Sequence, residues 1–151
     1  MPPLAVWGPP IWNLIHTLAE KIKDDQYPLL GQQLTNHIIR ICSYLPCPDC
    51  SSHAKTFFSK SPKNAFLTKK HFKESMFVLH NVVNRRKQKV VHNMDVLDIY
   101  KSHNVIRAYN KFAMVYNTKG NMKLLTDTFQ RQMIIRDFKR WLLTHIYAFD
   151  R

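Results

Sequence analysis

The chain has 151 residues, of which 45% are hydrophobic and 12% aromatic, and it contains only 3 glycines. This length fits one domain that buries its own core without disulfide staples, and the composition argues against a disordered tail or a turn-rich β-sandwich. The 23 Lys and Arg outnumber the 10 Asp and Glu and give a net charge of +13. Such a charge attracts nucleic acid, anionic membranes, acidic proteins or a phosphorylated cofactor, and does not by itself distinguish among them.

The N-terminus and the hydropathy pattern predict a cytoplasmic protein with no membrane span. No run of about 18 apolar residues occurs, and the start, Met1-Pro2-Pro3-Leu4, lacks the charged and apolar regions of a signal peptide. The chain has 3 cysteines, an odd number. Without an export signal, a disulfide in this chain is expected to be catalytic rather than structural.

Apolar residues at helical spacing predict a helix that begins near Pro9 and Pro10 and ends before Asp24. A second helix is predicted to follow Pro28 and to extend to about Tyr44. Both segments are punctuated by proline, which is tolerated at the start of a helix and ends the one before it.

A third helix is predicted from Cys47 to about Ser59, which places two cysteines in its first turn. Unpaired backbone N–H groups and the helix dipole stabilise a thiolate at that position. Thr68 is the predicted N-cap of a fourth helix, which ends in the basic run Arg85-Arg86-Lys87.

Residues 104–117 and 121–148 are predicted to form two more helices, separated by Thr118-Lys119-Gly120-Asn121. No segment has the pattern of a strong strand, so we expect an all-α fold. The last third of the chain either packs on the first four helices or forms a small helical appendage, and the sequence leaves both arrangements open.

The segment Cys47-Pro48-Asp49-Cys50 holds two thiols two residues apart, a spacing that closes into an easily reduced disulfide. The same spacing serves a zinc knuckle, a thioredoxin-like active site or a flavin-linked oxidase. Zinc would need further ligands, such as Cys42 and His53. A thioredoxin-like sheet would need alternating strands and helices, which this chain lacks.

Two other segments carry aromatic and polar side chains on one helical face. Trp12 and His16 are spaced i and i+4, so an indole and an imidazole project together toward a planar ligand. His80 and Asn84 have the same spacing, which suits stacking and hydrogen bonding to a nucleotide. Taken singly, each of these residues is more often part of a core.

The segment from Trp7 to Ala19, the Cys47–Cys50 pair and the segment from His80 to Lys89, in this order, resemble the Erv/ALR family of FAD-dependent sulfhydryl oxidases. The resemblance covers roughly residues 7–100. It implies four helices around the isoalloxazine ring of FAD, a short fifth helix and a homodimer. Residues 1–100 are then the FAD-binding domain, and residues 101–151 are a helical C-terminal extension. The implied activity passes electrons from a substrate dithiol through the protein disulfide and FAD to O2, with H2O2 as the product.

The resemblance also implies roles for individual residues. Cys50 is implied to lie against the flavin, and Cys47 to exchange disulfides with the substrate. Lys87 stands where many members have an apolar residue, and Tyr100 stands at about the interval where cellular members place a tryptophan. The implied cofactor contacts are Gly8, Trp12, His16, Cys50, His80, Asn81, Val83, Asn84, Lys87, Lys89 and Tyr100.

The chain departs from the cellular members of the family in two places. It has no second Cys-x-x-Cys pair, so a protein substrate or a small thiol shuttle protein is expected to meet Cys47 directly. Leu45 replaces the aromatic residue that commonly precedes the proline and the first cysteine. This minimal arrangement, with added C-terminal helices, looks most like the oxidases encoded by large cytoplasmic DNA viruses.

The alternative is a basic helical module that binds nucleic acid and uses the cysteine pair structurally or for zinc. It is motivated by the net charge of +13 and by the basic run from Arg85 to Lys89. It leaves the Trp7–Ala19 motif unexplained, so we do not expect nucleic acid as a partner.

Overall fold

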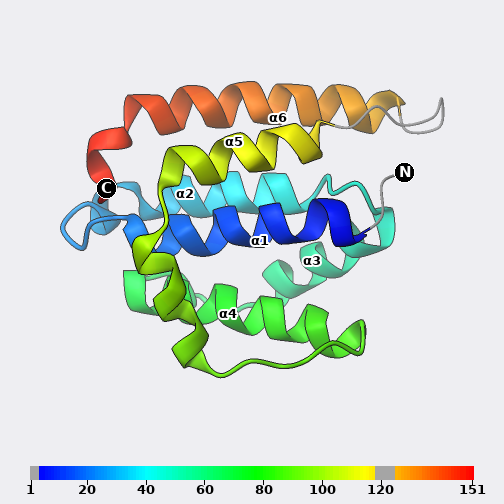
Figure 1. The fold of residues 1–151 in the computed structure, drawn as a ribbon, viewed down its shortest axis with the longest axis horizontal. Helices are drawn as coiled ribbons and strands as arrows, with labels where there is room; N and C mark the ends of the chain where they lie inside the picture. The colour runs from blue at the N-terminus through cyan, green and yellow to red at the C-terminus, as the bar shows by residue number, and fades with distance from the viewer. Residues whose placement is uncertain (1–3, 118–124) are drawn as a thin grey trace.

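The computed structural model describes residues 4–117 and 125–151. Within these residues the regular secondary structure is helical, apart from one isolated bridge between Ile22 and Phe149, so the expected all-α fold is confirmed. The elements in chain order are α1 (Leu4–Lys21), α2 (Tyr27–Cys42), α3 (Pro48–Lys60), α4 (Lys69–Arg86), the 3₁₀ helix η1 (Met94–Ser102), α5 (Val105–Tyr116), α6 (Leu125–Thr144) and the short 3₁₀ turn η3 (Ile146–Ala148) (Figure 1).

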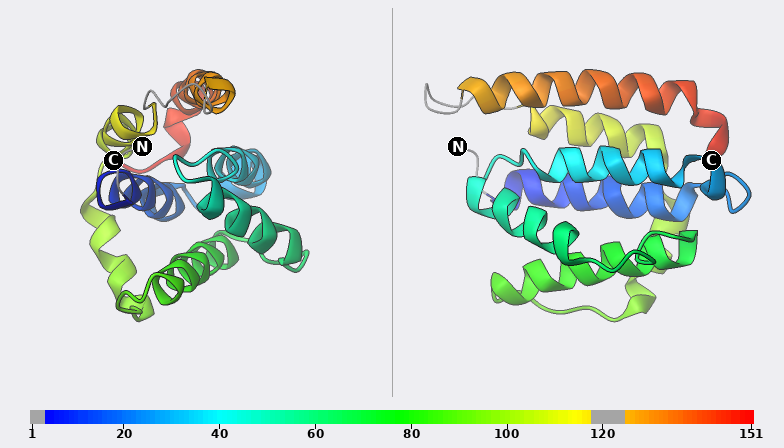
Figure 2. Two further views of the ribbon diagram at one scale, coloured as in Figure 1. Left: turned by 90° about the vertical axis from the view of Figure 1, so that its right-hand side faces the viewer. Right: turned by 180° about the vertical axis from the view of Figure 1, so that it is seen from behind.

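The helices lie in three layers. α1 and α2 run side by side in the middle layer, with α5 and α6 on one side and α3 and α4 on the other (Figure 1, Figure 2). α1 packs on α5 and also on α4 and η1, while α2 packs on α3 and α6. The first four helices and η1 agree in number and chain order with the four helices and short fifth helix that the resemblance implies, and α5 and α6 are additional.

α1 begins at Leu4, more than one turn before the predicted start at Pro9, so the predicted boundary is wrong. Both prolines lie inside the helix, where each lacks the N–H that would bond the carbonyl four residues earlier. Those carbonyls belong to Ala5 and Val6, which are exposed, so water can replace the missing donors. The added turn buries Trp7, which is 4% exposed, and this burial offsets the cost of the two lost bonds.

The predicted ends of the next helices agree with the structure to within about one turn. Thr68 caps α4 as predicted, because its Oγ1 accepts a hydrogen bond from the backbone N–H of His71 at 3.1 Å. These boundaries depend on side chains that are close in sequence, which explains why the sequence predicts them well.

The segment predicted as one helix over residues 121–148 forms two elements, because α6 ends at Thr144 and η3 follows. The break directs the C-terminus onto α1, where the backbone N–H of Asp150 donates to the carbonyl of Lys21 at 2.7 Å. The buried ammonium of Lys21 donates in turn to the carbonyl of Arg151 at 2.9 Å and to that of Lys101. The predicted separator at residues 118–121 lies outside the described residues.

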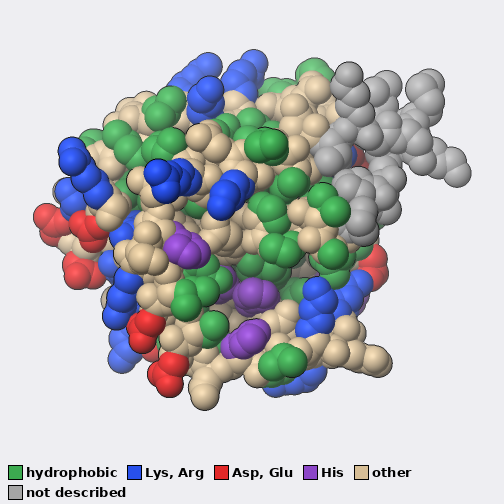
Figure 3. Space-filling view, viewed as in Figure 1, with side chains coloured by type: hydrophobic (Ala, Val, Ile, Leu, Met, Phe, Trp, Pro, Cys, Tyr) green, Lys and Arg blue, Asp and Glu red, His purple; other side chains and the backbone are tan. Residues whose placement is uncertain are grey.

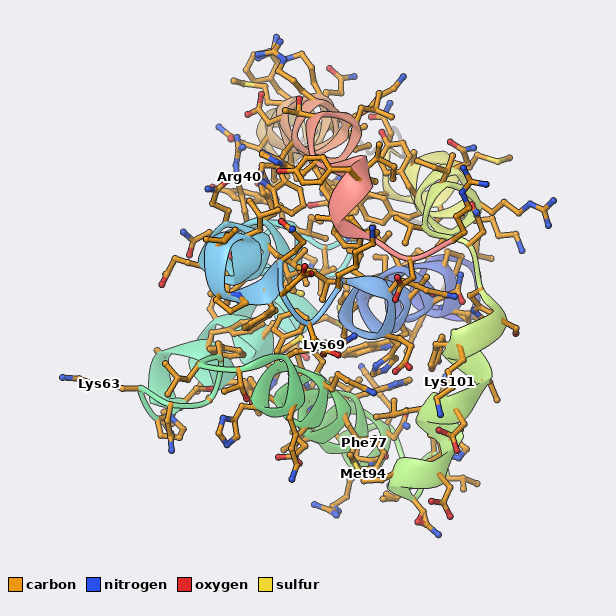
Figure 4. All side chains as sticks on the ribbon, turned by 90° about the vertical axis from the view of Figure 1, so that its left-hand side faces the viewer. Arg40, Lys63, Lys69, Phe77, Met94 and Lys101 are labelled. Carbon is orange, nitrogen blue, oxygen red and sulfur yellow. A yellow bond between two sulfur atoms is a disulfide. The ribbon has the colours of Figure 1, made fainter. Side chains whose placement is uncertain are left out.

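α5 and α6 share the core of the other helices. Phe112 and Tyr116 of α5 are fully buried, and the Tyr116 hydroxyl donates to the carbonyl of Ile41 in α2 at 2.9 Å. Arg40 of α2 reaches α6, where its Nη1 lies 2.7 Å from Oδ2 of Asp137 (Figure 4). Of the two arrangements left open by the sequence, the packed one is therefore found. The domain boundary near residue 100 stays a prediction.

One face of the molecule gives little support to the nucleic-acid alternative. On the face drawn in Figure 3, Lys and Arg side chains are scattered among hydrophobic, acidic and other side chains instead of forming one continuous stripe. No helix in the described part of the chain is long and apolar enough to cross a membrane.

Phe112→Ala is expected to lower the free energy of unfolding by about 3–5 kcal/mol, because it removes a fully buried ring from the core that α5 shares with the bundle. Chemical denaturation followed by circular dichroism measures the change. Met114→Ala, on the same helix but at a residue that is 82% exposed, is the control and should change the value by no more than about 0.5 kcal/mol. An unchanged transition for Phe112→Ala would mean that α5 does not stabilise the rest of the fold.

Candidate active site

The two cysteines at the start of α3 form a disulfide, with their Cα atoms 5.2 Å apart. Cys47 is the N-cap of α3, in an extended conformation, and its Sγ accepts a hydrogen bond from the backbone N–H of Cys50 at 3.2 Å. The predicted placement of the pair at a helix N-terminus is confirmed. Because a backbone N–H points at Cys47 Sγ, a negative charge on that sulfur is stabilised when the disulfide is reduced.

Short-range packing holds this end of α3 in place. The buried Ser51 accepts a hydrogen bond at its Oγ from the backbone N–H of Leu45 at 2.8 Å, so the segment before the cysteines folds back on the first turn of the helix. Ser51 and Ala54 are the buried residues of α3, which otherwise lies near the surface. The position of Cys50 therefore depends on a few specific contacts.

Cys50 lines an apolar pocket between α1, α3 and α4. Trp7, Ile11 and Trp12 of α1 form one wall, and Val83 of α4 forms another. The side chains leave about 40 Å³ free beside Cys50. This environment suits a flat apolar ring against the sulfur, provided that the side chains move apart to admit it.

A second, more polar pocket of about 210 Å³ adjoins the first, since both share Leu4, Trp12 and Val83 as walls, and we call the two pockets together the groove. It brings together most of the predicted cofactor contacts. These are Gly8, Trp12, His80, Val83, Asn84, Lys87, Lys89 and Tyr100. Gly8 lies on the wall where a side chain would be crowded, because an added Cβ would meet Cδ1 of Leu4 at 3.1 Å.

Aromatic rings from three elements form a stack beside this groove. The rings of Trp12 and His80 lie 4.1 Å apart at an interplanar angle of 8°. Their spacing leaves no room for a third ring, so the two rings together can serve only as a wall for a ligand. Tyr100 of η1 lies 5.0 Å from the ring of His16, which places it at the edge of the same cluster.

His16 supports His80 instead of facing the groove. It is 3% exposed, and its Nε2 lies 2.9 Å from Nδ1 of His80, so one of the two nitrogens donates and the other accepts. Burial, and then the neighbouring His80, lowers the pKa of His16 to about 3. Burial, followed by His92 and Lys89, lowers the pKa of His80 to about 4. Both imidazoles are thus neutral near pH 7, which preserves the hydrogen bond.

The chain reverses sharply after α4, and this turn places two lysines at the polar pocket. Gln88 adopts the left-handed conformation, with φ at 58°. The backbone N–H of Lys89 then donates to the carbonyl of Asn84 at 2.7 Å, which ends the helix as a Schellman turn does. Lys87 and Lys89, on either side of Gln88, both line the polar pocket. A diphosphate would meet two cations there.

Asn81 lines neither pocket. Its Nδ2 donates to the carbonyl of His92 at 2.9 Å, and its Oδ1 accepts from the backbone N–H of His92 at 3.1 Å. The side chain therefore anchors the segment between α4 and η1. The predicted cofactor contacts of Asn81 and His16 stay predictions that this geometry does not support.

Cys42 lies on the wall of the apolar pocket together with Cys50. It is 3% exposed, and burial raises the pKa of its thiol to about 12, so it is a neutral and unreactive group at ordinary pH. Among the described residues, no group of three or more His, Cys, Asp or Glu could hold a metal ion. The zinc interpretation of the cysteines is therefore not supported.

Several residues were not predicted from the sequence to line the pocket beside Cys50. Trp7 and Ile11 belong to the i, i+4 apolar stripe of α1, which indicates burial without indicating a pocket. Arg86 also lines the apolar pocket, and its Nη2 lies 3.1 Å from Oδ2 of Asp49. Nothing in the local sequence pairs these two residues, because they are far apart along the chain.

Known proteins are similar to this chain, and a family profile matches the segment that supplies most of the site. The sequence profile of the Erv1 / Alr family matches residues 9–105. An FAD-linked sulfhydryl oxidase from a Kenyan isolate of African swine fever virus is 27% identical to this chain over 96 residues. The match covers 63% of this chain and 80% of that protein. The FAD-linked sulfhydryl oxidase of a Malawian isolate gives the same identity and coverage. A protein of Invertebrate iridescent virus 3, which its name proposes as an FAD-linked sulfhydryl oxidase, is 31% identical over 87 residues, covering 56% of this chain and 57% of that protein. No solved structure matches the chain.

The neutral histidine pair predicts a loss of stability in mild acid. The unfolded imidazole of His16 has a pKa near 6.5 and the folded one about 3, so the unfolded state binds more protons between these values and stability falls as the pH decreases through 6.5. Between pH 7 and pH 5.5, His16 should contribute a loss of about 1 kcal/mol in the free energy of unfolding. Urea denaturation at both pH values should show a smaller loss for His16→Gln than for the unmodified protein. Equal losses would show that His16 is not kept neutral by the fold.

Proposed function

The chain belongs to the Erv1/Alr family, and from this premise we propose that Cys47 takes electrons from a thiol substrate while Cys50 passes them toward FAD. The protein is an FAD-dependent thiol oxidase that forms disulfides in its substrates, as the family and the viral relatives indicate. The observation that carries the division of roles is that Cys50 lines the apolar pocket, whereas Cys47 caps the helix outside it.

The residues of the two pockets are of the kinds that suit the separate parts of FAD. The apolar pocket beside Cys50 suits the isoalloxazine ring, and the pair Lys87 and Lys89 suits the diphosphate. Trp12 and His80 offer a flat wall for the adenine. When bound, FAD supplies the two-electron acceptor that reoxidises the cysteine pair and delivers the electrons to O2, which is released as H2O2.

The exchange with substrate uses the two cysteines in sequence. A substrate thiolate attacks Sγ of Cys47, which forms a mixed disulfide and releases Cys50 as a thiolate. The second substrate thiolate then attacks the substrate sulfur of the mixed disulfide, and Cys47 leaves. The substrate gains a disulfide, and its two electrons remain on Cys47 and Cys50. The N–H of Cys50, 3.2 Å from Cys47 Sγ, stabilises the departing sulfur in the second step.

We propose that a protein substrate, or a small thiol shuttle protein, meets Cys47 directly. The one further cysteine of this chain is Cys42, which is buried and cannot relay electrons from the surface. Pro48 and Asp49, between the two working cysteines, are exposed and leave the disulfide open to a partner.

We also propose a homodimer that works in the cytoplasm, at viral assembly sites or in the virion. The dimer is supported by the resemblance to the family, and the location by relatives that come from large DNA viruses. Sedimentation equilibrium should give twice the mass of the 17.9 kDa chain. A monomer mass, or recovery of the protein from the secretory pathway, would contradict these two proposals.

The purified protein is expected to be yellow and to consume O2 when a dithiol is added. Cys50→Ala should abolish this consumption and keep the flavin absorbance, because it removes the sulfur beside the flavin pocket and little else. Ser52→Ala, an exposed position on the same helix, is the matched control and should retain the activity. A colourless folded protein, or turnover by Cys50→Ala, would contradict the assignment.

A further inference from the structure

An ion pair joins the helical turn between Cys47 and Cys50 to the end of α4. Asp49 stands between Cys47 and Cys50, in the first turn of α3. Its Oδ2 lies 3.1 Å from Nη2 of Arg86, and its Oδ1 lies 3.5 Å from Nε2 of His53. A carboxylate inside the redox motif is thus held by a cation from another helix.

Stability does not explain this pair. The Asp49 side chain is 71% exposed and that of Arg86 29% exposed, and ion pairs at such exposed positions contribute little to folding because water and salt screen them. The location of the Asp49–Arg86 pair, next to the working cysteines, tells more about its role. Arg86 ends α4, and its side chain lines the apolar pocket together with Cys50.

Reduction of the disulfide adds a negative charge near the Asp49–Arg86 pair. Cys50 becomes a thiolate when a substrate attacks Cys47, and the neighbouring carboxylate of Asp49 repels that charge. The guanidinium of Arg86 neutralises the carboxylate and attracts the thiolate. A sulfur that is better stabilised as a thiolate leaves faster, and the disulfide it forms is a stronger oxidant.

We propose that Arg86 is a positioning residue that sets the oxidising strength of the Cys47–Cys50 disulfide by balancing the charge of Asp49. The proposal rests on the role assigned to Cys50 above. Arg86 acts on the exchange in which two substrate thiols are oxidised to a disulfide while Cys47 and Cys50 are reduced. The side chain supports this step through charge and forms no covalent bond.

The test is the redox equilibrium between the FAD-loaded protein and glutathione. In this reaction the Cys47–Cys50 disulfide and two glutathione thiols give two protein thiols and one glutathione disulfide. Anaerobic mixtures are quenched by alkylation, and the Cys47–Cys50 peptide is quantified by mass spectrometry. Arg86→Gln should shift the equilibrium toward the protein disulfide by about two- to fivefold. Asp49→Asn should shift it the opposite way by a similar factor, and the double variant should return close to the unmodified protein.

The opposite directions of the shifts expected for Arg86→Gln and Asp49→Asn distinguish an effect of charge from an effect of structure. A purely structural role would move both single variants in the same direction, because each breaks the same ion pair, and this result would overturn the proposal. Arg86→Lys keeps the charge and should restore the equilibrium. Arg85→Gln removes the same charge from the adjacent exposed residue and should leave the glutathione equilibrium unchanged. An equal shift from Arg85→Gln would show a general charge effect and would also overturn the proposal.

Two further readouts keep this result apart from the proposed function. The visible flavin spectrum of each variant shows whether the pocket still binds FAD. Oxygen consumption by the unmodified protein tests the oxidase activity itself. If the unmodified protein consumes oxygen and the variants leave the glutathione equilibrium unchanged, only the proposed role of Arg86 is contradicted. If it does not turn over, the proposed roles of the cysteines fail, whatever the glutathione equilibrium.

Discussion

Burial of α1 on both sides is the constraint on which the rest of the structure depends. One side packs on α5, and the other packs on α4 and η1, so residues such as Leu14 and Leu18 are almost completely buried. The same helix supplies Trp7 and Trp12 to the pocket that holds Cys50. Among the described residues, neither pocket of the site is lined by a side chain of α5 or α6. These helices are nevertheless important for the site, because they cover the apolar side of α1 that would otherwise face water.

The site separates its charges from its flat neutral surfaces. The charged groups at the site are Lys87, Lys89 and the Asp49–Arg86 pair, whereas His80 in the cluster of rings is kept neutral by burial. A neutral imidazole can stack on Trp12 without adding to the positive charge of Lys89 nearby. The arrangement suits a ligand with an apolar ring at one end and a diphosphate further along.

Local rules predicted the helices well where side chains close in sequence decide their ends. Thr68 caps α4, and Cys47 caps α3 with the thiols at its first turn. The predictions were wrong where distant packing decides. α1 extends past Pro9 because Trp7 finds a buried place, and the segment predicted to run to residue 148 breaks after Thr144 because the C-terminus turns back onto α1. Proline and periodicity report on the local backbone, and tertiary burial can outweigh them.

The sequence alone determined an all-α fold, a dithiol at a helix N-terminus, and the helical faces that carry Trp12 and His80. Only the tertiary structure decided which faces oppose each other. His16 shares a face with Trp12 by spacing, yet it bonds His80 behind the groove, while Asn81 bonds the backbone of the following loop. The Asp49–Arg86 pair likewise joins two helices. Helical spacing places a side chain on a side of its own helix, but its neighbours across the interface depend on how segments distant in sequence pack together.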